Sequence, residues 1–458
     1  MVERPDVTRR LLFDVTGLLH WYAFFSNPSG IQRVAEKLLS STAVQQNKRV
    51  EFVARALGGD ELFRVDGDTL RDLQDPLRRR AAIARLRALF TMTMRHARRR
   101  GPSSDTAIVH VPYFLFGWAH LAPLVEAWFS RRLPTALPPL EAVREPGPQD
   151  VFFNPGDLWW QNHYAPFVLR LKARTGVKVV QMIHDLFFIE RPDWFSPTFA
   201  RTFPSTFGAV APGVDRWLAN STFVKEQLAT YLESHSLPPR PVEILPMGWD
   251  SFAVSRGEDR ASATAALRRY GIVGQPFILF VGTVEPRKNL ATLLDVMEDL
   301  RRDLSERVPE LVVVGGYGWN AKGLAARLWR DPHTRWLTRV HDADLSAIYR
   351  AALFTVSPSH SEGWGLPVQE SIAHGVPCIA SSGGALRESG HGLAVHFDPS
   401  DPASLKSAMA HWITDGAALR RERVRIAEAL GSEQLPTWDD AGEVLLKQAR
   451  LDGNGRDP

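Results

Sequence analysis

The second half of the sequence alternates short apolar runs with segments of helical spacing. Helical patterns such as Asn289–Arg301 and Leu345–Ala351 separate the runs, which are Phe277–Gly282, Glu310–Gly315, Phe354–Ser357, Val376–Ser381 and Leu393–Phe397. Apolar strands that alternate with helices are typical of a parallel sheet with helices on both faces. The pattern therefore predicts a doubly wound α/β domain.

The first half repeats this rhythm less regularly. The helical segment Gly30–Ser40 lies among runs of β type, which are Leu11–Val15, Glu51–Arg55, Ala107–Val111, Val151–Asn154, Val177–Ile183 and Trp217–Ala219. Two such series predict two doubly wound domains, which suits a chain of 458 residues. We place the join in the polar stretch Gly248–Ala263, so that residues 1–250 and 251–458 form the two domains. Ligands of such sheets bind at the carboxyl ends of the strands, so two facing domains would form a binding cleft there.

Composition excludes several classes of protein. Hydrophobic residues make up 44% of the chain and charged residues 23%, which are ordinary values for a folded globular protein. The net charge is only +4, so charge alone does not indicate a nucleic-acid partner. No apolar stretch reaches the ~18–20 residues of a spanning helix, and Asp14 breaks the N-terminal run, which excludes a signal peptide. Cys378 is the single cysteine, so no intrachain disulfide can form and we expect a cytoplasmic protein.

The most specific candidate site is the segment SHSEGWGLPVQES, residues 359–371, which follows a predicted strand. Gly363 and Gly365 allow backbone to approach a ligand closely. Pro367 suits the first turn of a helix that would stop at Gly375. The free N–H groups at the start of that helix would form an anion site.

Two carboxylates belong to this segment, Glu362 in the loop and Glu370 about one turn into the helix. Both can point into one pocket, where they would accept paired hydrogen bonds from the vicinal hydroxyls of a ribose or a hexose. An acid at a helix start is also favoured by the helix dipole without any function. The surrounding glycines favour the binding site over that alternative.

The second candidate segment is FVGTVEPRKNL, residues 280–290. A strand is expected to end at Gly282, and Arg287 and Lys288 stand at the start of the next helix, which Asn289 could cap. Two cations at such a position are well placed for a pyrophosphate. Taken alone, an adjacent Arg-Lys pair is usually a solvated one.

These segments resemble retaining glycosyltransferases of the GT-B fold, in particular glycosyltransferase family 4. EGWGLPVQE matches the E-x₇-E motif of that family, and VGTVEPRKNL, with VVVGG downstream, resembles its phosphate-binding segment. PSGIQRVAEKLL and MIHDLFFIERPDWF are similar to N-domain segments of bacterial members. The resemblance covers most of the chain and implies two Rossmann-like domains that face each other across a cleft.

The resemblance also implies a role for each matching residue. Glu370 would bind the ribose hydroxyls of the donor, and Glu362 would contact the hydroxyls of the donor sugar. Arg287 and Lys288 would hold the pyrophosphate and stabilise its departing charge. The other implied donor contacts come from His184 and Gly30 on the N-domain side, and from the backbone of Gly363, Trp364, Gly365 and Leu366.

Some features keep two interpretations. In one interpretation Asp185 orients His184. In the other, His184 is a capped histidine of the core. Asp342 and Asp344 spell a D-x-D sequence, yet acids are expected at the start of the helix there. No cluster of His, Cys, Asp and Glu has the spacing of metal ligands, so we predict no metal and no cofactor beside the sugar nucleotide.

Three further motifs are weaker signals. Gly383 and Gly384 either approach the nucleotide or form a plain turn. The segment VVVGGYGWNA, which starts at Val312, lacks a full G-x-G-x-x-G. Trp159 and Trp160 form either an acceptor surface or part of the core.

The segment Leu77–Arg100 carries nine arginines and no acid. Its apolar residues Ile83, Leu86, Phe90 and Met94 recur at helical spacing, which suits either an anionic membrane surface or an ordinary helix whose stripe faces the core. No fold signal for nucleic-acid binding accompanies the basic run. We expect a cytoplasmic location, with this helix as the candidate for peripheral attachment to the inner face of the membrane.

Together these features predict a retaining hexosyltransferase. GDP-mannose is the first choice of donor, and a glycan or lipid-linked glycan of bacterial surface polysaccharide is the expected acceptor. A phosphorylase-like enzyme on the same fold would need a cofactor-binding lysine motif, which we do not find. The remaining alternative is a non-catalytic protein that binds nucleotide sugars or acts as a scaffold.

Overall fold

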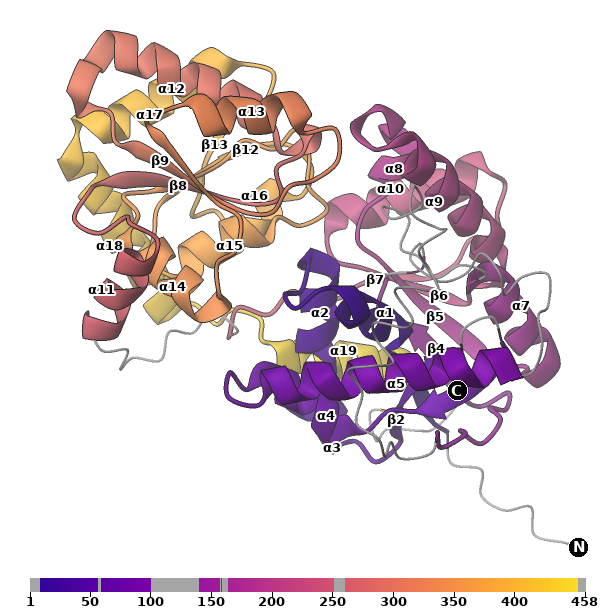
Figure 1. Cartoon of the computed structure of the whole chain (residues 1–458). Coiled ribbons are helices and arrows are strands. Elements are labelled where there is room, and N and C mark those ends of the chain that lie inside the picture. Colours follow the sequence, from indigo (N-terminus) through magenta and orange to yellow (C-terminus); the bar gives the residue numbers. More distant parts are fainter. Residues whose placement is uncertain are drawn as a thin grey trace, which may run out of the picture.

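The computed structural model describes residues 9–56, 59–99, 140–156, 158, 164–250 and 260–451. These residues form two largely parallel β-sheets, each with helices on both faces (Figure 1). The predicted α/β architecture of two Rossmann-like, doubly wound domains is confirmed.

The N-terminal sheet has seven strands among the described residues, in the order β3-β2-β1-β4-β5-β6-β7. They are β1 (Leu11–Asp14), β2 (Val50–Arg55), β3 (Leu62–Arg64), β4 (Val151–Asn154), β5 (Lys178–Ile183), β6 (Arg216–Ala219) and β7 (Val242–Ile244). Neighbouring strands are parallel, except that β3 pairs antiparallel with β2 at the edge. The predicted strand Ala107–Val111 lies outside the described residues.

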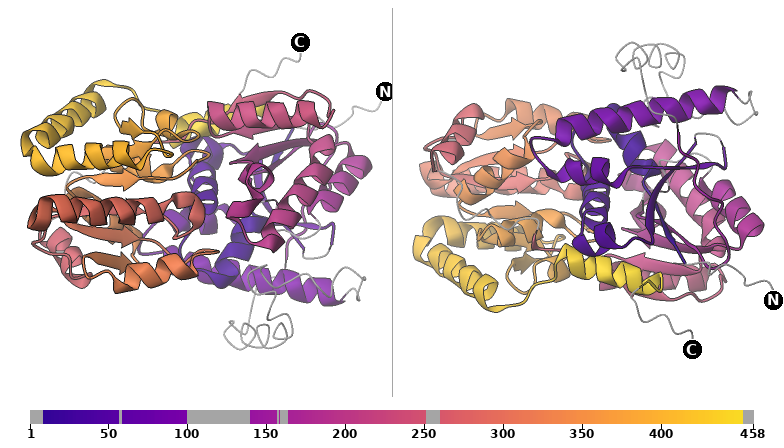
Figure 2. Two further views of the ribbon diagram at one scale, coloured as in Figure 1. Left: turned by 90° about the horizontal axis from the view of Figure 1, so that it is seen from above. Right: turned by 90° about the horizontal axis from the view of Figure 1, so that it is seen from below.

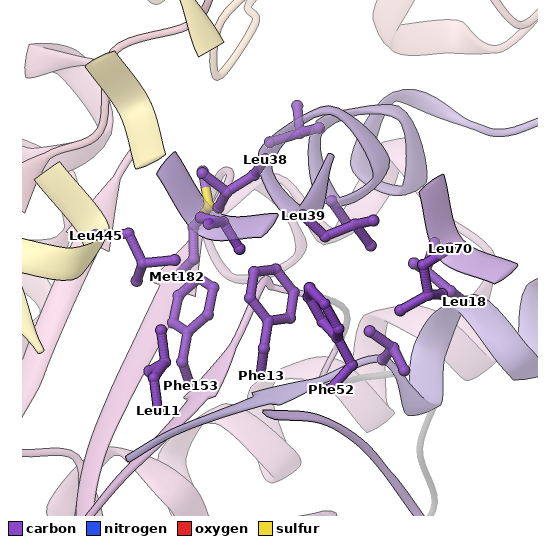
Figure 3. Close-up of a cluster of buried hydrophobic side chains, with 14 of the residues drawn as sticks. Leu11, Phe13, Leu18, Leu38, Leu39, Phe52, Leu70, Phe153, Met182 and Leu445 are labelled. Carbon is purple, nitrogen blue, oxygen red and sulfur yellow. The ribbon is translucent and has the colours of Figure 1, made fainter. Parts of the chain in front are cut away.

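Alternate residues of β1 pack on opposite faces of this sheet, as the two-residue period of a strand requires. Leu11 and Phe13 belong to the buried cluster drawn in Figure 3, where the ring centroids of Phe13 and Phe153 lie 5.0 Å apart. Leu12 and Phe152 belong to a second cluster on the other face. Because both faces are buried, the strands are apolar without alternation.

The helices of the N-terminal domain connect these strands. They are α1 (Thr16–Phe24), α2 (Gly30–Leu39), α3 (Thr42–Gln46), α4 (Gly67–Arg71), α5 (Arg79–Arg99), α7 (Tyr164–Thr175), α8 (Phe187–Glu190), α9 (Pro197–Val210) and α10 (Thr222–Ser234). Short 3₁₀ turns lie at Asp72–Gln74, Pro192–Trp194 and Ala211–Gly213. The predicted helix Gly30–Ser40 corresponds to α2.

The C-terminal sheet has six described strands in the order β10-β9-β8-β11-β12-β13, all in parallel pairs. They are β8 (Phe277–Val281), β9 (Glu310–Val314), β10 (Thr334–Leu337), β11 (Thr355–Ser357), β12 (Cys378–Ser381) and β13 (Val395–Phe397). The sequence predicted all of them except β10. That edge strand reads TRWL, with only Trp336 buried, and so lacks a continuous apolar run.

Its helices are α11 (Arg260–Arg269), α12 (Leu290–Leu304), α13 (Lys322–Arg330), α14 (Asp342–Ala351), α15 (Leu366–Ala373), α16 (Leu386–Ser389), α17 (Pro402–Thr414) and α18 (Gly416–Ser432). Further 3₁₀ turns lie at Pro286–Lys288 and Ser305–Arg307. Residues of β8 alternate between two clusters, with Ile278 and Phe280 in one and Phe277 and Leu279 in the other.

The C-terminal helix α19 (Trp438–Gln448) packs on the N-terminal domain (Figures 1 and 2). Trp438 and Leu445 belong to the same buried cluster as Phe13. Gly442 lies so close to α3 that a Cβ there would be 2.5 Å from the hydroxyl oxygen of Ser41. The predicted second domain, residues 251–458, thus includes a helix that belongs by its packing to the first.

The apolar stripe of the predicted basic helix is buried. Ile83, Leu86 and Phe90 of α5 pack into the core, and the Phe90 ring contacts His20 and Phe24 of α1. These three residues therefore face the protein core, as one of the two interpretations of the helix expected. No helix in the described ranges has the length and apolar character needed to cross a membrane.

Candidate functional site

The candidate site lies where the loop after β11 meets the loop after β5 of the other domain. Gly363 fits there because it has no side chain: a Cβ would lie 1.9 Å from the carbonyl oxygen of His184. The Ser221 hydroxyl donates a 2.7 Å hydrogen bond to the Gly363 carbonyl. The two domains therefore touch through backbone at the predicted site.

Glu362, Arg287 and Lys288 form one ionic cluster. Arg287 Nη1 lies 2.5 Å from Glu362 Oε2, and Lys288 Nζ lies 2.6 Å from Glu362 Oε1. The Ser359 hydroxyl donates to the same Oε1 atom at 2.6 Å, and Arg287 Nη2 lies 2.9 Å from Glu285 Oε1. The structure thus brings together the three residues that the sequence assigned to the donor sugar and its pyrophosphate.

Burial and charge act in opposite directions on this cluster. Burial alone would raise the pKa of Glu362, but the Coulombic attraction of Arg287 and Lys288 lowers that pKa to about 2. Burial would lower the pKa of Arg287, yet Glu362 and Glu285 raise it above its usual value. Both side chains are therefore charged at neutral pH, and a pyrophosphate would share the two cations with Glu362.

The helix after the Gly-rich loop forms as predicted. Gly365 adopts a left-handed φ of 99° at the N-cap of α15, and a Cβ there would lie 2.5 Å from Leu386 Cδ2. The N-cap Gly365 has no side chain to cap this helix, Pro367 has no N–H, and the Val368 N–H donates to the Gly365 carbonyl at 3.0 Å. The helix ends at Ala373, before Gly375 with its φ of 72°.

Glu370 is buried between partners from both domains. The Tyr349 hydroxyl donates to Glu370 Oε2 at 2.7 Å, and Arg33 Nη1 from α2 lies 3.4 Å from Glu370 Oε1. Arg33 Nη2 also lies 3.1 Å from Asp342 Oδ1. Arg33 is a site residue that we did not predict, although it lies in the segment PSGIQRVAEKLL that carried the resemblance.

Gly30 begins the same helix, α2, which faces α15 across the domain boundary (Figure 1). Nothing lies within 4 Å of a Cβ built on Gly30, so there is open space at this helix start. The contact of Gly30 with a donor phosphate stays a prediction.

His184 follows β5 and is buried. Its Nε2 atom lies 2.8 Å from the Pro155 carbonyl oxygen, which makes Nε2 the protonated ring nitrogen. Burial lowers the pKa of His184 to about 4, so the ring is neutral at physiological pH. Asp185 does not orient this ring, because its carboxylate instead accepts from the Phe187 N–H at 3.3 Å. The orienting group that the sequence missed is a backbone carbonyl.

The side chains of Trp364 and Leu366 face the N-terminal core. Trp364 Nε1 donates to Gln369 Oε1 at 2.8 Å, and Gln369 Nε2 donates in turn to the carbonyls of Met247 and Gly248. These side chains hold the two domains together. The predicted donor contacts of Trp364 and Leu366 would therefore come from their backbone.

The paired glycines after β12 act through close backbone packing. A Cβ on Gly383 would lie 2.0 Å from the His360 carbonyl oxygen, and Gly384 forms a parallel bridge with Glu362. In the same way, a Cβ on Gly315 would lie 1.9 Å from the Gly282 carbonyl oxygen. These glycines allow neighbouring loops to meet, and the packing of Gly383 and Gly384 fixes the backbone of Glu362.

The remaining candidates separate in the structure. Asp342 pairs with Arg33, whereas Asp344 pairs with Arg269, so the D-x-D acids have different partners. Within the described ranges, no group of three or more His, Cys, Asp or Glu side chains could hold a metal ion. Asn289 has no capping hydrogen bond to α12, because its Oδ1 atom accepts from the Thr292 hydroxyl. Trp159 and Trp160 lie outside the described residues.

Comparisons with known proteins identify the C-terminal domain. Residues 265–429 match the family described as "Glycosyl transferases group 1". The serotype-specific mannosyltransferase WbdA of Escherichia coli is 27% identical over 288 residues, which are 60% of this chain and 34% of WbdA. A D-inositol 3-phosphate glycosyltransferase of Thermomonospora curvata is 29% identical over 328 residues, or 67% of this chain and 72% of that protein. This chain therefore spans only about a third of the length of WbdA.

Solved structures confirm the fold over nearly the whole chain. Sucrose-phosphate synthase from Thermosynechococcus elongatus superimposes with a TM-score of 0.59 at 16% identity, covering 96% of this chain and 98% of that one. Anabaena Alr3699/HepE in complex with UDP and glucose superimposes with a TM-score of 0.57 at 13% identity, covering 97% of this chain and 100% of that one. The chain has the GT-B fold and carries a group 1 glycosyltransferase domain.

Proposed function

We propose that this protein is a retaining glycosyltransferase of family 4. It transfers a hexose from a nucleotide sugar to a glycan or lipid-linked glycan acceptor in the assembly of a bacterial surface polysaccharide. The observation that carries the proposal is the buried cluster of Arg287, Lys288 and Glu362, which lies at the domain boundary within a group 1 glycosyltransferase domain.

The cluster supplies the electrostatics of the chemical step. The bond between the anomeric carbon and the diphosphate oxygen breaks, and its electron pair leaves with the diphosphate. Arg287 and Lys288 stabilise that growing negative charge, together with the positive end of the α15 helix dipole. Because these groups are fixed and buried, they need little reorganisation during the reaction.

The acceptor hydroxyl attacks from the face that the diphosphate leaves, and its proton passes to the departing diphosphate oxygen. This course retains the configuration and needs no protein nucleophile. Neutral His184, held by Pro155, and ionised Glu362 would contact the donor sugar from the two domains. The ribose hydroxyls would bind Glu370.

GDP-mannose is the donor that we propose first. The supporting fact is that several relatives are described as mannosyltransferases, among them WbdA and the O-antigen chain mannosyltransferase B of Escherichia coli, 30% identical over 194 residues. The latter match covers 42% of this chain and 50% of that protein. We propose no metal cofactor, because two protein cations already stand beside Glu362. A cytoplasmic location accords with the use of a sugar nucleotide.

Among the described residues of 77–100, Ile83, Leu86 and Phe90 are buried and Leu77 is exposed, so contact with an anionic membrane would rest mainly on charge. Arg78 and Arg80 are exposed there, but Arg78 already lies within ion-pair distance of Asp72 and Asp75. We therefore place the lipid-linked acceptor at the domain interface and not on this helix.

The test incubates the protein with GDP-mannose, UDP-glucose and a dTDP-hexose, first without and then with a mannoside acceptor. We expect one donor to release its nucleoside diphosphate, and NMR of the product to show the anomeric configuration of the donor. Nucleotide binding without any release would favour the non-catalytic alternative. An inverted product would refute retention.

A further inference from the structure

A pocket of about 380 Å³ lies between the domains, beside the ionic cluster. The N-terminal domain lines it with Phe187, Glu190, Arg191 and Trp194, and the C-terminal domain lines it with His360 and Ser361 and with the loop after β13. This volume is within the range of ligand sites, ~300–1,000 Å³. None of the residues assigned to the donor lines the pocket.

One side of the pocket is aromatic. The rings of Trp194 and His360 stack across the domain boundary, with centroids 5.8 Å apart and planes inclined by 18°. The Phe187 ring lies 5.8 Å from the Trp194 ring, and the Arg191 guanidinium lies 4.3 Å above Trp194. Phe187 and Trp194 are buried and the His360 ring is exposed, so His360 offers most of the flat apolar contact to the C–H face of a sugar ring.

The rest of the pocket is polar and charged. Glu190 accepts from Gln227, which fixes the carboxylate near the rim, and Arg191 Nη2 lies 2.7 Å from Asp193 Oδ2. Glu190 offers acceptors and Arg191 offers donors, so hydroxyls of either orientation can be bound. An aromatic wall with convergent hydrogen-bonding groups suits a saccharide better than a lipid chain.

The pocket is next to the reacting groups. Arg287 lies with its guanidinium carbon 5.5 Å from the Phe187 ring centroid, and its Nη1 atom donates to the Ser361 carbonyl at 3.0 Å. The same guanidinium binds Glu362. Two residues of the pocket lining, Phe187 and Ser361, therefore contact Arg287 directly.

The pocket also lies at the end of the site away from Glu370. Glu370 is linked through Arg33 to Asp342, which follows β10 at one edge of the C-terminal sheet. The loop after β13, at the opposite edge, closes the pocket. A donor with its ribose at Glu370 and its diphosphate at Arg287 would direct its sugar toward the pocket.

We propose that this pocket binds the pyranose ring of the acceptor glycan that carries the attacking hydroxyl. The inference rests on the proposed function and adds to it the acceptor subsite and its chemical class. The ring would lie along His360, which Trp194 supports from below, with its hydroxyls on Glu190 and Arg191.

The test measures binding of methyl α-mannopyranoside, with methyl α-glucopyranoside and methyl β-galactopyranoside as further probes, by saturation-transfer NMR at saturating GDP. The variants are Glu190→Gln and His360→Ala, which keep the buried Trp194 in place. Matched controls are Glu226→Gln on α10 and His411→Ala on α17, both exposed. GDP affinity is measured on every protein by calorimetry.

We expect at least one glycoside to bind the parent, and both pocket variants to weaken it about tenfold or more, while the controls and GDP affinity stay unchanged. Parent protein that binds GDP but no glycoside, or pocket variants that bind as the parent does, would overturn the acceptor subsite. Absence of binding to any nucleoside diphosphate would instead count against the proposed function itself.

Discussion

Arg33 Nη1 lies 3.4 Å from Glu370 Oε1, although the two residues are 337 positions apart and belong to different domains. The carboxylate that is proposed to bind the ribose is thus held by a guanidinium of the facing domain. Burial would lower the pKa of Arg33, but Glu370 and Asp342 raise it above its usual value. The Arg33 guanidinium is therefore charged at every physiological pH, and it joins the two domains beside Glu370.

Removing this guanidinium should destabilise the protein. In Arg33→Met the buried carboxylate of Glu370 loses its guanidinium and keeps the hydrogen bond from Tyr349, and we expect a loss of about 1–3 kcal/mol with a lower Tm. Arg71→Met is the control, because its pair with Asp68 is exposed and such pairs contribute ~0–1 kcal/mol. Equal melting temperatures for Arg33→Met and the parent would show that the contact does not stabilise the domain interface.

Glu370→Gln should weaken nucleotide binding. The amide keeps the shape of the side chain and one acceptor, but it loses the charge that strengthens hydrogen bonds from ribose hydroxyls. We expect a loss of about 1.5–3 kcal/mol in GDP binding by calorimetry. Glu433→Gln, which removes an exposed carboxylate beside His391, serves as control. Unchanged GDP affinity in a folded Glu370→Gln protein would remove the ribose assignment.

Burial of His184 should appear in the pH dependence of stability. Its pKa is about 4 in the folded protein and 6.5 in a model peptide, so between these values the unfolded chain binds more protons. The contribution of His184 to the free energy of unfolding is complete above pH 6.5. It falls by on the order of 3 kcal/mol as the pH falls toward 4. Burial raises the pKa of Glu36 to about 7, so the contribution of Glu36 to stability falls as the pH rises, opposite to that of His184. The difference in stability between the His184 variant and the parent therefore isolates the effect of His184.

The measurement is urea unfolding of the parent, His184→Asn and His411→Asn between pH 4 and 7. The difference in free energy of unfolding between His184→Asn and the parent should narrow by on the order of 3 kcal/mol as the pH falls, and this change should exceed any seen for His411→Asn, the exposed control. Parallel curves for all three proteins would mean that His184 titrates normally in the folded state.

Much of this arrangement was predictable. The apolar runs of β8, β9, β11 and β12 are buried on both faces, so their sequence alone predicts the sheet. The segment EGWGLPVQE combines glycines at close backbone contacts with two acids, and this local pattern is visible without the fold.

What was missed depends on distant contacts. A single arginine on a helix, such as Arg33, has the same appearance in sequence whether it faces solvent or a carboxylate of the other domain. The apolar face of α19 predicts a buried helix but not which sheet it covers. The orienting partner of His184 is a backbone carbonyl, which carries no side-chain signal.

Chelation should leave turnover intact. Arg287 and Lys288 provide positive charge beside Glu362, and we propose that they replace a divalent ion in stabilising the departing diphosphate. We expect the same rate in EDTA as in Mg²⁺. Loss of activity in EDTA that Mg²⁺ or Mn²⁺ restores would contradict this account.

The central claim is that Arg287 and Lys288 act on the transition state. Charge on the diphosphate grows as the sugar bond breaks, and a fixed cation gains most from that growth. Arg287→Lys should not restore the full rate, because a point charge does not replace the planar guanidinium that binds Glu362, Glu285 and the Ser361 carbonyl together.

The most direct measurement is steady-state kinetics of Arg287→Ala and Lys288→Ala with saturating acceptor and varied sugar nucleotide. We predict that kcat falls about 10²–10³-fold in each, the scale of one lost electrostatic donor. A rise in KM with kcat unchanged would contradict the claim, because the two cations would then only anchor the donor.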